Sequence, residues 1–518
     1  MLFNSLNFLF GFLPIVLLVF YVIGASGWQR ATIVWLVAAS LFFYGWWNPI
    51  YLSLLVGSIL FNYIIGCALV REECRKQLLI LGIIGDLTLL GYYKYANFFI
   101  ENANIILSTN LSTAEIVLPL GISFFTFTQI AFLVDAYRGK AKELNFINYS
   151  LFVTYFPHLI AGPVLHHKEM MPQFAHAETY RLNWENLAVG LTVFTIGLFK
   201  KAVLADGIAI YATPVFNAAQ AGVALTLFEA WGGGLSYSFQ IYFDFSGYSD
   251  MAVGLSLLFG VRLPINFYSP YQSHNIIEFW RRWHMTLSRF LRDYLYISLG
   301  GNRKGPIRRH FNLFATMLLG GLWHGASWNF VIWGGLHGFY LAANHIWHTF
   351  LNQRGCSINP AYGWRKVLTI ALTFLAVTLA WVPFRAESYS AASEILGAMF
   401  GLNGLSLPSR LADLTPWLAD WSVTFDGMFN HDLAPWSSGL IWLTGLAIVI
   451  WLMPNTQQIM EQFRPTLDGY TAHPLALHWG WYRWMPSRFN TVFIAILGFV
   501  SLTWLLIGNY SEFLYFQF

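Results

Sequence analysis

The chain has 518 residues, of which 57% are hydrophobic and only 10% are Asp, Glu, Lys or Arg. An ordinary soluble domain carries roughly 25% charged residues, so the composition excludes a water-soluble globular protein. A bilayer core takes about 20 apolar residues of helix to cross, and several charge-free stretches reach that length. We therefore expect an all-α, polytopic transmembrane helical bundle with roughly 10–13 membrane passages, re-entrant segments included.

The predicted spans begin with residues 7–23, which no Lys or Arg precedes, so we expect a retained span and not a cleaved signal peptide. Residues 31–70 form a helical hairpin that turns at Trp46-Trp47-Asn48-Pro49. The other apolar segments are 78–93, 116–134, 144–165, 186–199, 207–228, 230–243, 310–353, 367–384, 433–453 and 489–511. Barrel strands would alternate polar and apolar residues, whereas these runs are continuously apolar, so the spans are helices.

Charge placement predicts the orientation, because basic loops face the cytoplasm. The basic loops are Arg71–Lys76, Arg138–Lys142, Lys200-Lys201, Arg281–Arg309 and, more weakly, Arg365-Lys366. The acidic residues gather instead in segment 385–436, as Glu387, Glu394, Asp413, Asp420, Asp426 and Asp432. We expect one integral-membrane domain over residues 1–518, in which 385–436 is an extramembrane, periplasmic loop. The three cysteines, Cys67, Cys74 and Cys356, match no disulfide or metal motif and are interpreted as packing residues.

Two carboxylates, Asp244 and Asp250, stand at the end of a long apolar run, in the sequence Tyr-Phe-Asp-Phe-Ser-Gly-Tyr-Ser-Asp. Carboxylates at membrane depth usually face a bundle interior or a water-filled cavity. The structural interpretation is that they cap a helix end or pair with an arginine of the basic region, and it is the favoured one.

A basic, aromatic-rich segment runs from Glu278 to Tyr294 and is predicted to form one helix. In that helix Glu278 precedes Arg282 by four residues and Arg289 precedes Asp293 by four, so their charges compensate. Trp280, His284 and Ser288 would share one face. The whole region Arg281–Arg309 is either a face that binds lipid phosphates or an electrostatic funnel for an anionic, phosphate-bearing substrate.

The most informative segment, 310–353, has no formal charge and contains the motif Gly-Leu-Trp-His-Gly around His324. An ionisable group at bilayer depth is a functional candidate, and a neutral imidazole is well suited to proton transfer near neutral pH. The competing interpretation is a zinc site formed by His324, His337, His345 and His348. Their spacing matches no ligand pattern and no Cys or acidic residue accompanies them, so we expect no metal.

Four motifs in order resemble the membrane-bound O-acyltransferase (MBOAT) family. They are Tyr155 to Pro163 (YFPHLIAGP), the Asp244 run, the Arg-Arg-Trp-His-Met-Thr-Leu-Ser segment around His284 and the Trp-His-Gly segment around His324. The opening Met-Leu-Phe-Asn-Ser and the closing Phe-Leu-Tyr-Phe-Gln-Phe are most similar to the bacterial alginate O-acetyltransferase branch.

This resemblance implies a bundle in which a funnel from the cytoplasm meets a narrower passage near His324, the expected catalytic residue, with His284 as the second. Trp323, Asn329 and Asp244 are the expected supporting residues of the active site or channel, and Arg281, Arg282 and Arg289 the expected donor-binding residues. The resemblance also implies acetyl-CoA as the donor, no bound cofactor, and periplasmic acetyltransferase partners of an exopolysaccharide pathway in the bacterial inner membrane.

The polymer follows only from the resemblance, which favours alginate and keeps cellulose or another cell-surface polymer as the alternative. Two other classes stay open at this stage. A transporter or channel would use Asp244, Asp250 and the histidines as a proton or ion relay. A scaffold of a secretion complex would use segment 385–436 to bind partners.

Overall fold

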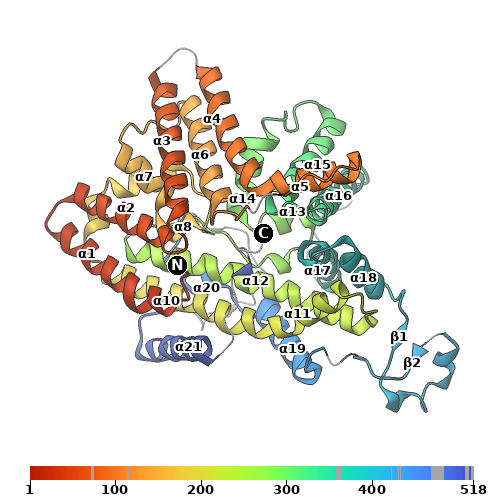
Figure 1. Cartoon of the computed structure of the whole chain (residues 1–518). Coiled ribbons are helices and arrows are strands. Elements are labelled where there is room, and N and C mark those ends of the chain that lie inside the picture. Colours follow the sequence, from red (N-terminus) through yellow and green to blue (C-terminus); the bar gives the residue numbers. More distant parts are fainter. Residues whose placement is uncertain are drawn as a thin grey trace.

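The computed structural model of the chain is built almost entirely of helices (Figure 1). It describes residues 1–71, 75–113, 116–160, 162–355, 363–421, 423–429, 431, 433–467, 483–507 and 513–514. Predictions about Cys74, Cys356 and Asp432, about Ala161 and about residues 515–518 fall outside the described residues, as does the side chain of Asp420. In the described part, the two strands are β1 (Leu405–Ser406) and β2 (Val423–Thr424), which pair in parallel.

The first part of the chain contains the predicted hairpin, with Asn48 accepting a hydrogen bond from Ile50 N at the turn. Its elements are η1 (Asn7–Phe12), α1 (Leu13–Ala25), α2 (Gln29–Gly45), α3 (Ile50–Arg71), α4 (Arg75–Leu90), η2 (Gly91–Tyr95), α5 (Ala96–Leu107), α6 (Ile122–Tyr137), α7 (Phe146–Thr154), α8 (Phe156–Leu159), α9 (His167–Phe174) and η3 (Ala177–Tyr180). The predicted span 144–165 is broken at Tyr155, whose non-helical backbone (φ −49°, ψ 107°) separates α7 from α8.

The second part of the chain is also mainly helical. Its elements are α10 (Trp184–Phe199), η4 (Lys200–Ala205), α11 (Asp206–Gln220), α12 (Leu227–Leu258), η5 (Pro270–Gln272), α13 (Ile276–Trp280), α14 (Met285–Phe290), η6 (Leu291–Tyr296), α15 (Gly305–His324), α16 (Trp328–Gln353), α17 (Trp364–Arg385), α18 (Tyr389–Met399), η7 (Ser409–Leu411), η8 (Pro416–Trp421), α19 (Trp436–Leu452), α20 (Thr456–Ile459) and α21 (Arg488–Ile507).

The 32-residue helix α12 forms the centre of the bundle, and α10, α11, α17, α18 and α19 pack around it. Nearly all of its side chains are buried, so its mixture of small and polar residues faces protein and not lipid. It starts in a capping box, in which Thr226 accepts from Glu229 N and Glu229 accepts from Thr226 N. The predicted span 230–243 is therefore the first half of a longer helix that also contains the Asp244 motif.

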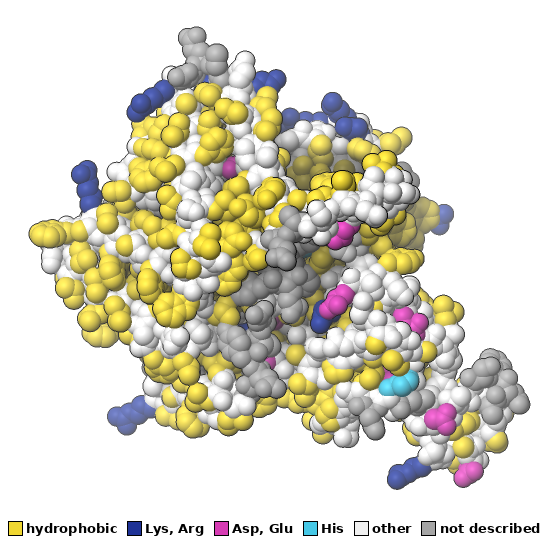
Figure 2. Space-filling model, in the orientation of Figure 1, with side chains coloured by type: hydrophobic (Ala, Val, Ile, Leu, Met, Phe, Trp, Pro, Cys, Tyr) yellow, Lys and Arg dark blue, Asp and Glu magenta, His cyan; other side chains and the backbone are white. Residues whose placement is uncertain are grey.

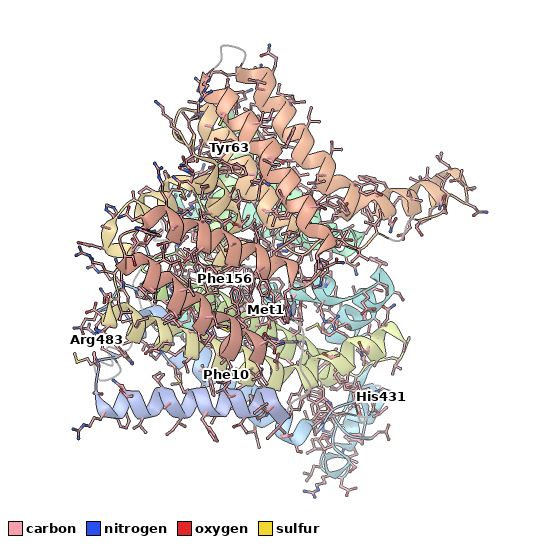
Figure 3. The ribbon with its side chains drawn as sticks, turned by 60° about the vertical axis from the view of Figure 1, so that its left-hand side comes forward. Met1, Phe10, Tyr63, Phe156, His431 and Arg483 are labelled. Atoms are coloured by element: carbon pink, nitrogen blue, oxygen red, sulfur yellow. The ribbon has the colours of Figure 1, made fainter. Side chains whose placement is uncertain are left out.

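Large apolar side chains cover the outside of the bundle, as expected where lipid is the solvent. Figure 2 shows hydrophobic side chains over much of the visible face. Figure 3 contrasts Phe10, which is 66% exposed on the outer surface, with Phe156, which is fully buried. Of the described residues, six helical segments are long and apolar enough to cross a membrane: Asn7–Ala25, Ile50–Arg71, Arg75–Leu107, Trp184–Gln220, Trp364–Arg385 and Arg488–Ile507. The all-α polytopic membrane fold is thus confirmed.

Three of the predicted basic loops gather on one face. Arg75 donates to the carbonyl oxygens of Leu69 and Ala136, which brings the start of α4 to the end of α6. Tyr294, in the basic region, in turn donates to Asp135 near the same end of α6. Because α3 runs from the Trp46–Pro49 turn to Arg71, this hairpin turn lies at the other end of the helix, away from the basic face.

The prediction of a basic loop at Lys200-Lys201 is wrong, because both lysines lie in η4, inside the continuous helical stretch Trp184–Gln220. Lys200 Nζ lies 2.6 Å from Asp250, and Lys201 Nζ lies 2.8 Å from Asp244. Asp244 and Asp250 therefore pair with lysines, and the predicted arginine partner or helix cap is wrong as well. At membrane depth an opposite charge is the partner that makes burial of either group tolerable.

A pair of glycines explains how these charges meet. A Cβ built on Gly197 of α10 would overlap the backbone at Gly247 and Met251 of α12, and a Cβ on Gly247 would overlap Gly197 in return. With no side chain at either position the two helices approach closely, as small residues allow in membrane helices. The close crossing places Lys200 and Lys201 beside the carboxylates of α12.

In segment 385–436, α18 packs against the bundle, whereas the short 3-10 turns and the β1–β2 pair extend away from it (Figure 1). The far end of the segment returns to the bundle at His431, labelled at the periphery in Figure 3, whose backbone N–H and Nδ1 contact Glu229 at the start of α12.

Candidate active site

His324 is the last residue of α15, and Gly325–Ser327 turn the chain directly into α16. The two helices pack tightly at Gly321. A Cβ built there would overlap the carbonyl oxygen of Phe330 and crowd the backbone of Gly334, so this close approach needs a glycine. The glycines of this motif therefore serve helix packing. The result is a histidine at a helix end, buried among the surrounding helices.

The ring of His324 lies among aromatic side chains. Its centroid is 4.8 Å from that of Trp323, 5.0 Å from that of Trp333 and 5.1 Å from that of Phe384. A cavity of about 20 Å³ adjoins it, which is room for about one water-sized group. The cavity is lined by Ile241, Asp244, Phe245, Trp283, His324, Trp333, Trp381, Phe384, Phe513 and Leu514.

Helix η2 holds the end of α15 in place. Lys94 Nζ donates to the carbonyl oxygens of Trp323, at 2.5 Å, and His324, at 3.0 Å. The hydroxyl of Tyr95 donates to the carbonyl of Leu322 at 2.8 Å. Carbonyls at a helix C-terminus have no partner within the helix, and in apolar surroundings each needs another donor. Two neighbouring residues thus satisfy the three last carbonyls of the helix that carries His324.

A second cavity, of about 660 Å³, adjoins Lys94 and Trp323. Trp46 and Trp47 of the α2–α3 turn also line it, so it lies toward the end of the bundle that is opposite the basic face. The polar side chains Ser5, Asn7 and Ser123 share this lining. We call it the outer cavity.

His284 lies in a break between α13 and α14, with a left-handed backbone (φ 42°, ψ 55°). The predicted single helix from Glu278 to Tyr294 is therefore wrong, and Trp280, His284 and Ser288 do not share a helical face. The physical reason is the neighbouring loop 266–268: Tyr268 N donates to Arg282 O, and Met285 N donates to Asn266 O. These bonds take the backbone of this turn away from helix geometry.

Asn266 fixes the ring of His284. Its Oδ1 lies 3.0 Å from His284 Nδ1 and also accepts from the hydroxyl of Thr286, while its Nδ2 donates to Ser249. Because Oδ1 can only accept, Nδ1 of His284 carries the proton, and a neutral ring then presents Nε2 as an acceptor. Phe245, 4.7 Å from the His284 ring, also lines the small cavity, and so connects the two histidines.

Asp244 lines the same small cavity and is buried. Lys201 holds its Oδ1, and the backbone N–H of Leu514 donates to its Oδ2 at 3.1 Å. Phe513 stacks on Tyr248 at 4.5 Å. The structure thus brings the C-terminal residues Phe513 and Leu514 into the cavity beside His324.

The remaining predicted residues lie at different distances from this centre. Trp323 stacks on Phe127 at 5.1 Å and lines the outer cavity. Asn329 is buried in the first turn of α16, where its Nδ2 donates to Ala386 O at 2.8 Å. His337 is fully buried and accepts from Trp280 Nε1. Among the residues that the structure describes, no three His, Cys, Asp or Glu side chains converge on a point where a metal would fit.

The three arginines predicted to bind the donor have different surroundings. Arg281 is exposed, whereas Arg282 is buried and pairs with Glu278, as predicted. The predicted pairing of Arg289 with Asp293 is wrong: Arg289 makes a bidentate pair with Glu169, at 2.7 and 2.9 Å, and Asp293 pairs with Arg292. The chain widens into the π-helix η6 at Leu291, so Asp293 is no longer one regular turn after Arg289.

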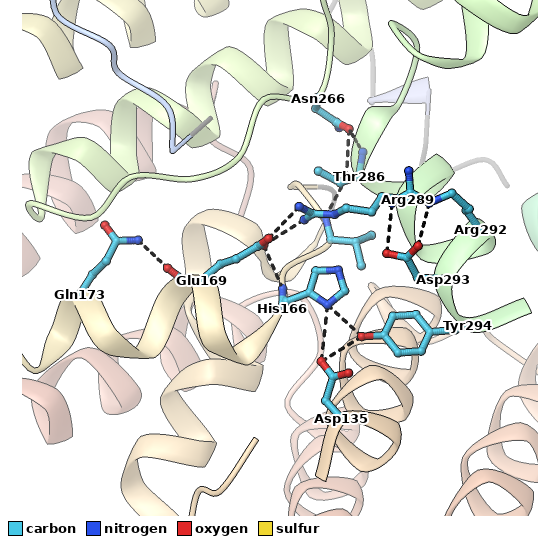
Figure 4. Close-up of polar contacts among 11 residues, drawn as sticks. Asp135, His166, Glu169, Gln173, Asn266, Thr286, Arg289, Arg292, Asp293 and Tyr294 are labelled. Carbon is cyan, nitrogen blue, oxygen red and sulfur yellow. Dashed lines mark hydrogen bonds and ion pairs between the residues drawn. The ribbon is translucent and has the colours of Figure 1, made fainter. Parts of the chain in front are cut away.

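Figure 4 shows the Arg289–Glu169 and Arg292–Asp293 pairs beside a second polar cluster. The hydroxyl of Tyr294 lies 3.0 Å from Asp135 Oδ2 and 2.8 Å from His166 Nδ1. His166 N also donates to Glu169, the partner of Arg289. Helices α6, α9 and η6 are thereby joined at the basic face.

Comparison with known proteins decides the family. The model of the family described as "MBOAT, membrane-bound O-acyltransferase family" matches residues 91–378. The chain belongs to this family. It is 42% identical over 490 residues to a peptidoglycan O-acetyltransferase of Helicobacter pylori, covering 89% of this chain and 91% of that protein. It is 44% identical over 416 residues to a Pseudomonas putida protein named probable alginate O-acetylase AlgI, covering 79% and 82%. A teichoic acid D-alanyltransferase of Streptococcus thermophilus is 30% identical over 282 residues, covering 51% and 68%.

The protein is therefore a membrane-bound O-acyltransferase, and both the family prediction and the enzyme prediction are confirmed. Its site also contains residues that the sequence analysis did not single out, namely Lys94, Tyr95 and Asn266. For Lys94 a signal existed, because it is a lone lysine at the end of a long apolar segment. For Asn266 there was none, since an asparagine in a loop has no distinguishing pattern.

Proposed function

We propose that this O-acyltransferase moves acetyl groups from acetyl-CoA to hydroxyl groups of a cell-surface polymer, with alginate as the polymer. The observation that carries the proposal is the position of His324, buried at a helix end between the basic face and the outer cavity. A family of acyltransferases and several O-acetyltransferase relatives support an acetyl group as the cargo.

In the proposed reaction the acceptor hydroxyl attacks the thioester carbonyl. A C–O bond forms, the C–S bond breaks, and the hydroxyl proton passes to His324 and then to the leaving thiolate. His284 has its Nδ1 proton bound by Asn266, so in the neutral state its Nε2 accepts a hydrogen bond. We therefore assign His284 to orienting a hydroxyl group or a water, and assign the role of oxyanion donor to the second Nδ2 proton of Asn329 and to backbone N–H groups of the turn.

The donor is proposed to arrive from the basic face, which the positive-inside rule places in the cytoplasm. The acceptor is proposed to reach His324 from the outer cavity, where Trp46 and Trp47 offer flat aromatic faces beside polar side chains. This arrangement fits a multi-pass protein of the bacterial inner membrane that supplies periplasmic acetyltransferase partners. We assign no bound cofactor.

The test is polymer acetylation in cells that carry His324→Ala. The matched control is His345→Ala, since His345 belongs to the same charge-free segment but does not line the cavity. We expect the acetyl content to disappear in the first strain and to remain in the second, at equal membrane levels of protein. Persistent acetylation with His324→Ala would reopen the transporter and scaffold interpretations.

The polymer needs its own measurement, because the peptidoglycan relative aligns over a longer share of the chain than the alginate relative does. Acetyl groups are to be quantified separately in alginate, peptidoglycan and cellulose fractions of both strains. Loss confined to the alginate fraction supports the proposal. Loss confined to another fraction keeps the enzyme assignment and replaces the polymer.

A further inference from the structure

A group of buried polar side chains joins α3, α4 and α6, which lie side by side in Figure 1. Asn62 of α3 donates through Nδ2 to Asp86 Oδ1 of α4, at 2.7 Å. Gln129 of α6 donates to the hydroxyl of Ser58 at 2.8 Å and accepts from the hydroxyl of Tyr149 at 3.3 Å. Asp86 is 2% exposed and Asn62 is fully buried. None of these residues belongs to the site around His324.

Asp86 and Asn62 lie near the middle of their spans. From Arg75 at the basic face to Asp86, the helix rises by roughly 16 Å, and from Asn62 to Arg71 by roughly 14 Å. The hydrocarbon core of a bilayer is about 30 Å thick. A carboxylate at this depth is costly and is normally paired with another charged group.

Asp86 has no such partner. Asp244 and Asp250 each lie within 2.8 Å of a lysine, whereas no Lys, Arg or His among the described residues lies within 4.0 Å of the Asp86 carboxyl group. The titratable group that faces it is Tyr149 of α7, which also faces Cys67 of α3. Neither of them supplies a positive charge.

No charged side chain of the neighbouring helices compensates Asp86 either. Residues 50–70 of α3 contain no Lys, Arg, Asp or Glu. Tyr63 of α3 donates to the carbonyl of Leu144. In α6 the ionisable groups, Asp135 and Tyr137, stand at the far end of the helix, beside the basic face. An ionised Asp86 would therefore be an uncompensated charge in the bundle.

The hydrogen bonds show where a proton is needed. Asn62 Nδ2 donates to Asp86 Oδ1 and also, at 3.1 Å, to the carbonyl of Ser58. Because a carbonyl oxygen only accepts, the nitrogen of Asn62 must stand on this side of the amide. Two buried oxygens then remain without a partner among the described residues, Asn62 Oδ1 and Asp86 Oδ2. Both are acceptors as long as Asp86 is ionised, so neither can satisfy the other.

A single proton on Asp86 removes this conflict. A carboxylic acid offers one O–H donor and one acceptor, and a primary amide also offers both. The two groups are therefore complementary, with Asn62 Nδ2 donating to Oδ1 and the protonated Oδ2 donating to Asn62 Oδ1. Protonation also removes the charge from the apolar surroundings, where a buried polar group is tolerated once it is hydrogen-bonded.

We propose that Asp86 is a proton-binding site, which holds a proton on Oδ2 at neutral pH and pairs with Asn62 as a carboxylic acid. When the pH is raised, the proton is lost to water and the carboxylate is left with the Nδ2 donor alone. The pair between α3 and α4 is then weakened. The stabilisation is thus present at lower pH and is lost on the alkaline side.

The proton site bears on catalysis through Lys94. Lys94 follows Asp86 by about two turns in the same helical stretch, and it holds the carbonyl oxygens of Trp323 and His324. Asp86 is therefore a positioning residue: its pair with Asn62 fixes the stretch that carries Lys94. This kinetic consequence rests on the proposed function, whereas the proton site does not.

Infrared spectroscopy of the full-length protein measures the proton directly. The sample is kept near neutral pH, where exposed carboxyl groups are ionised, in a detergent without ester or carboxyl groups. We expect the C=O stretch of a protonated carboxylic acid in wild type and its loss in Asp86→Asn. The matched control is Asp250→Asn, which removes a buried carboxylate that pairs with Lys200 and is expected to keep the band. An equal band in wild type and Asp86→Asn overturns the proposal.

Thermal unfolding of the same variants checks the pairing. Asparagine places an N–H donor where the acid has its O–H, so Asp86→Asn is expected to keep the midpoint of wild type within about 1 °C. Asp250→Asn leaves Lys200 without its charged partner and is expected to lower the midpoint by about 3–5 °C. An equal loss in Asp86→Asn overturns the proposal. It is also overturned if Na⁺, but not choline, raises the midpoint of wild type and not of Asp86→Asn, because Na⁺ then takes the place of the proton.

The dependence of kcat on pH separates positioning from packing. In wild type, kcat for acyl transfer is expected to fall on the alkaline side as Asp86 ionises. Asp86→Asn has no proton to lose in this range and is expected to keep its kcat where wild type has lost most of it, whereas Asp86→Leu lacks the pair at every pH and stays low. Coinciding profiles of wild type and Asp86→Asn overturn the positioning role. An infrared band without any transfer from acetyl-CoA removes the proposed donor and leaves the proton site standing.

Discussion

Replacing Lys94 by methionine removes the donor that holds the last two carbonyls of α15 while it preserves most of the side-chain volume. A hydrogen bond from a charged group is worth about 1.5–3 kcal/mol, and Lys94 makes two of them, to Trp323 O and His324 O. Without them, the hydrogen bond from Tyr95 to Leu322 O remains at the helix end. A shift of the catalytic group of about 1 Å is enough to lower a rate on the order of 100-fold, or about 2.7 kcal/mol of barrier.

We therefore expect Lys94→Met to lower kcat for acetyl transfer about 100-fold, with KM for acetyl-CoA within a factor of about three, because Lys94 positions the helix end that carries His324. Tyr95→Phe, which removes one neutral hydrogen bond, is expected to lower kcat about tenfold or less. Lys76→Met, an exposed lysine at the other end of the same helical stretch, is the control. Wild-type kcat in Lys94→Met at equal membrane levels would refute the reasoning, as would a KM effect that exceeds the kcat effect.

Three further changes test the packing that supports the site. Asp244→Asn removes one of the charged partners of buried Lys201. We expect the free energy of unfolding, measured by thermal unfolding in detergent, to fall by about 3 kcal/mol and to be partly restored by adding Lys201→Met. Gly321→Ala overlaps the opposing helix and is expected to destabilise by about 1–3 kcal/mol, whereas Gly335→Ala, which meets only ordinary contacts, is neutral within about 0.5 kcal/mol. His284→Ala is expected to be about 1 kcal/mol less stable than His284→Asn, because Asn tolerates a left-handed backbone; equal stability would mean that the turn relaxes.

The sequence was sufficient for the class of fold and for the helical hairpin at Trp46–Pro49, because both follow from hydrophobic length and from interfacial and turn residues. It was also sufficient for Arg282 and Glu278, whose spacing needs only one regular turn of helix. Predictions failed where a local rule met a tertiary contact. The helix expected from Glu278 to Tyr294 is interrupted by backbone hydrogen bonds to segment 266–268. Neither segment has a sequence pattern that predicts this pairing.

Lys200 and Lys201 are the clearest case of such a failure. A pair of lysines between two apolar runs satisfies every criterion of a cytoplasmic loop. The charges that hold them in the bundle lie on α12, some 50 residues later in the chain. The only local indication was Gly197, whose partner Gly247 lies within the Asp244 motif. A pairing of glycines between two helices cannot be recognised before the helices are known to cross.

Three π-helical segments of the chain carry polar or charged side chains that contact other helices. Of the four π-helical segments in the described residues, η2 carries Lys94 and Tyr95, η4 carries Lys200 and Lys201, and η6 carries Arg292 through Tyr294. A π-turn adds a residue to the helical turn and so rotates the side chains that follow it relative to those before it. Within a transmembrane helix, this lets apolar residues on either side keep facing lipid or core while the polar residues at the wide turn point toward partners on another helix. The segments η2 and η4 serve the end of the His324 helix and the carboxylates of α12 in this way, and η6, outside the candidate spans, brings Tyr294 to Asp135 and His166. A substitution that returned η2 to regular helix would therefore move Lys94 away from the α15 carbonyls without changing a single residue of the His324 motif.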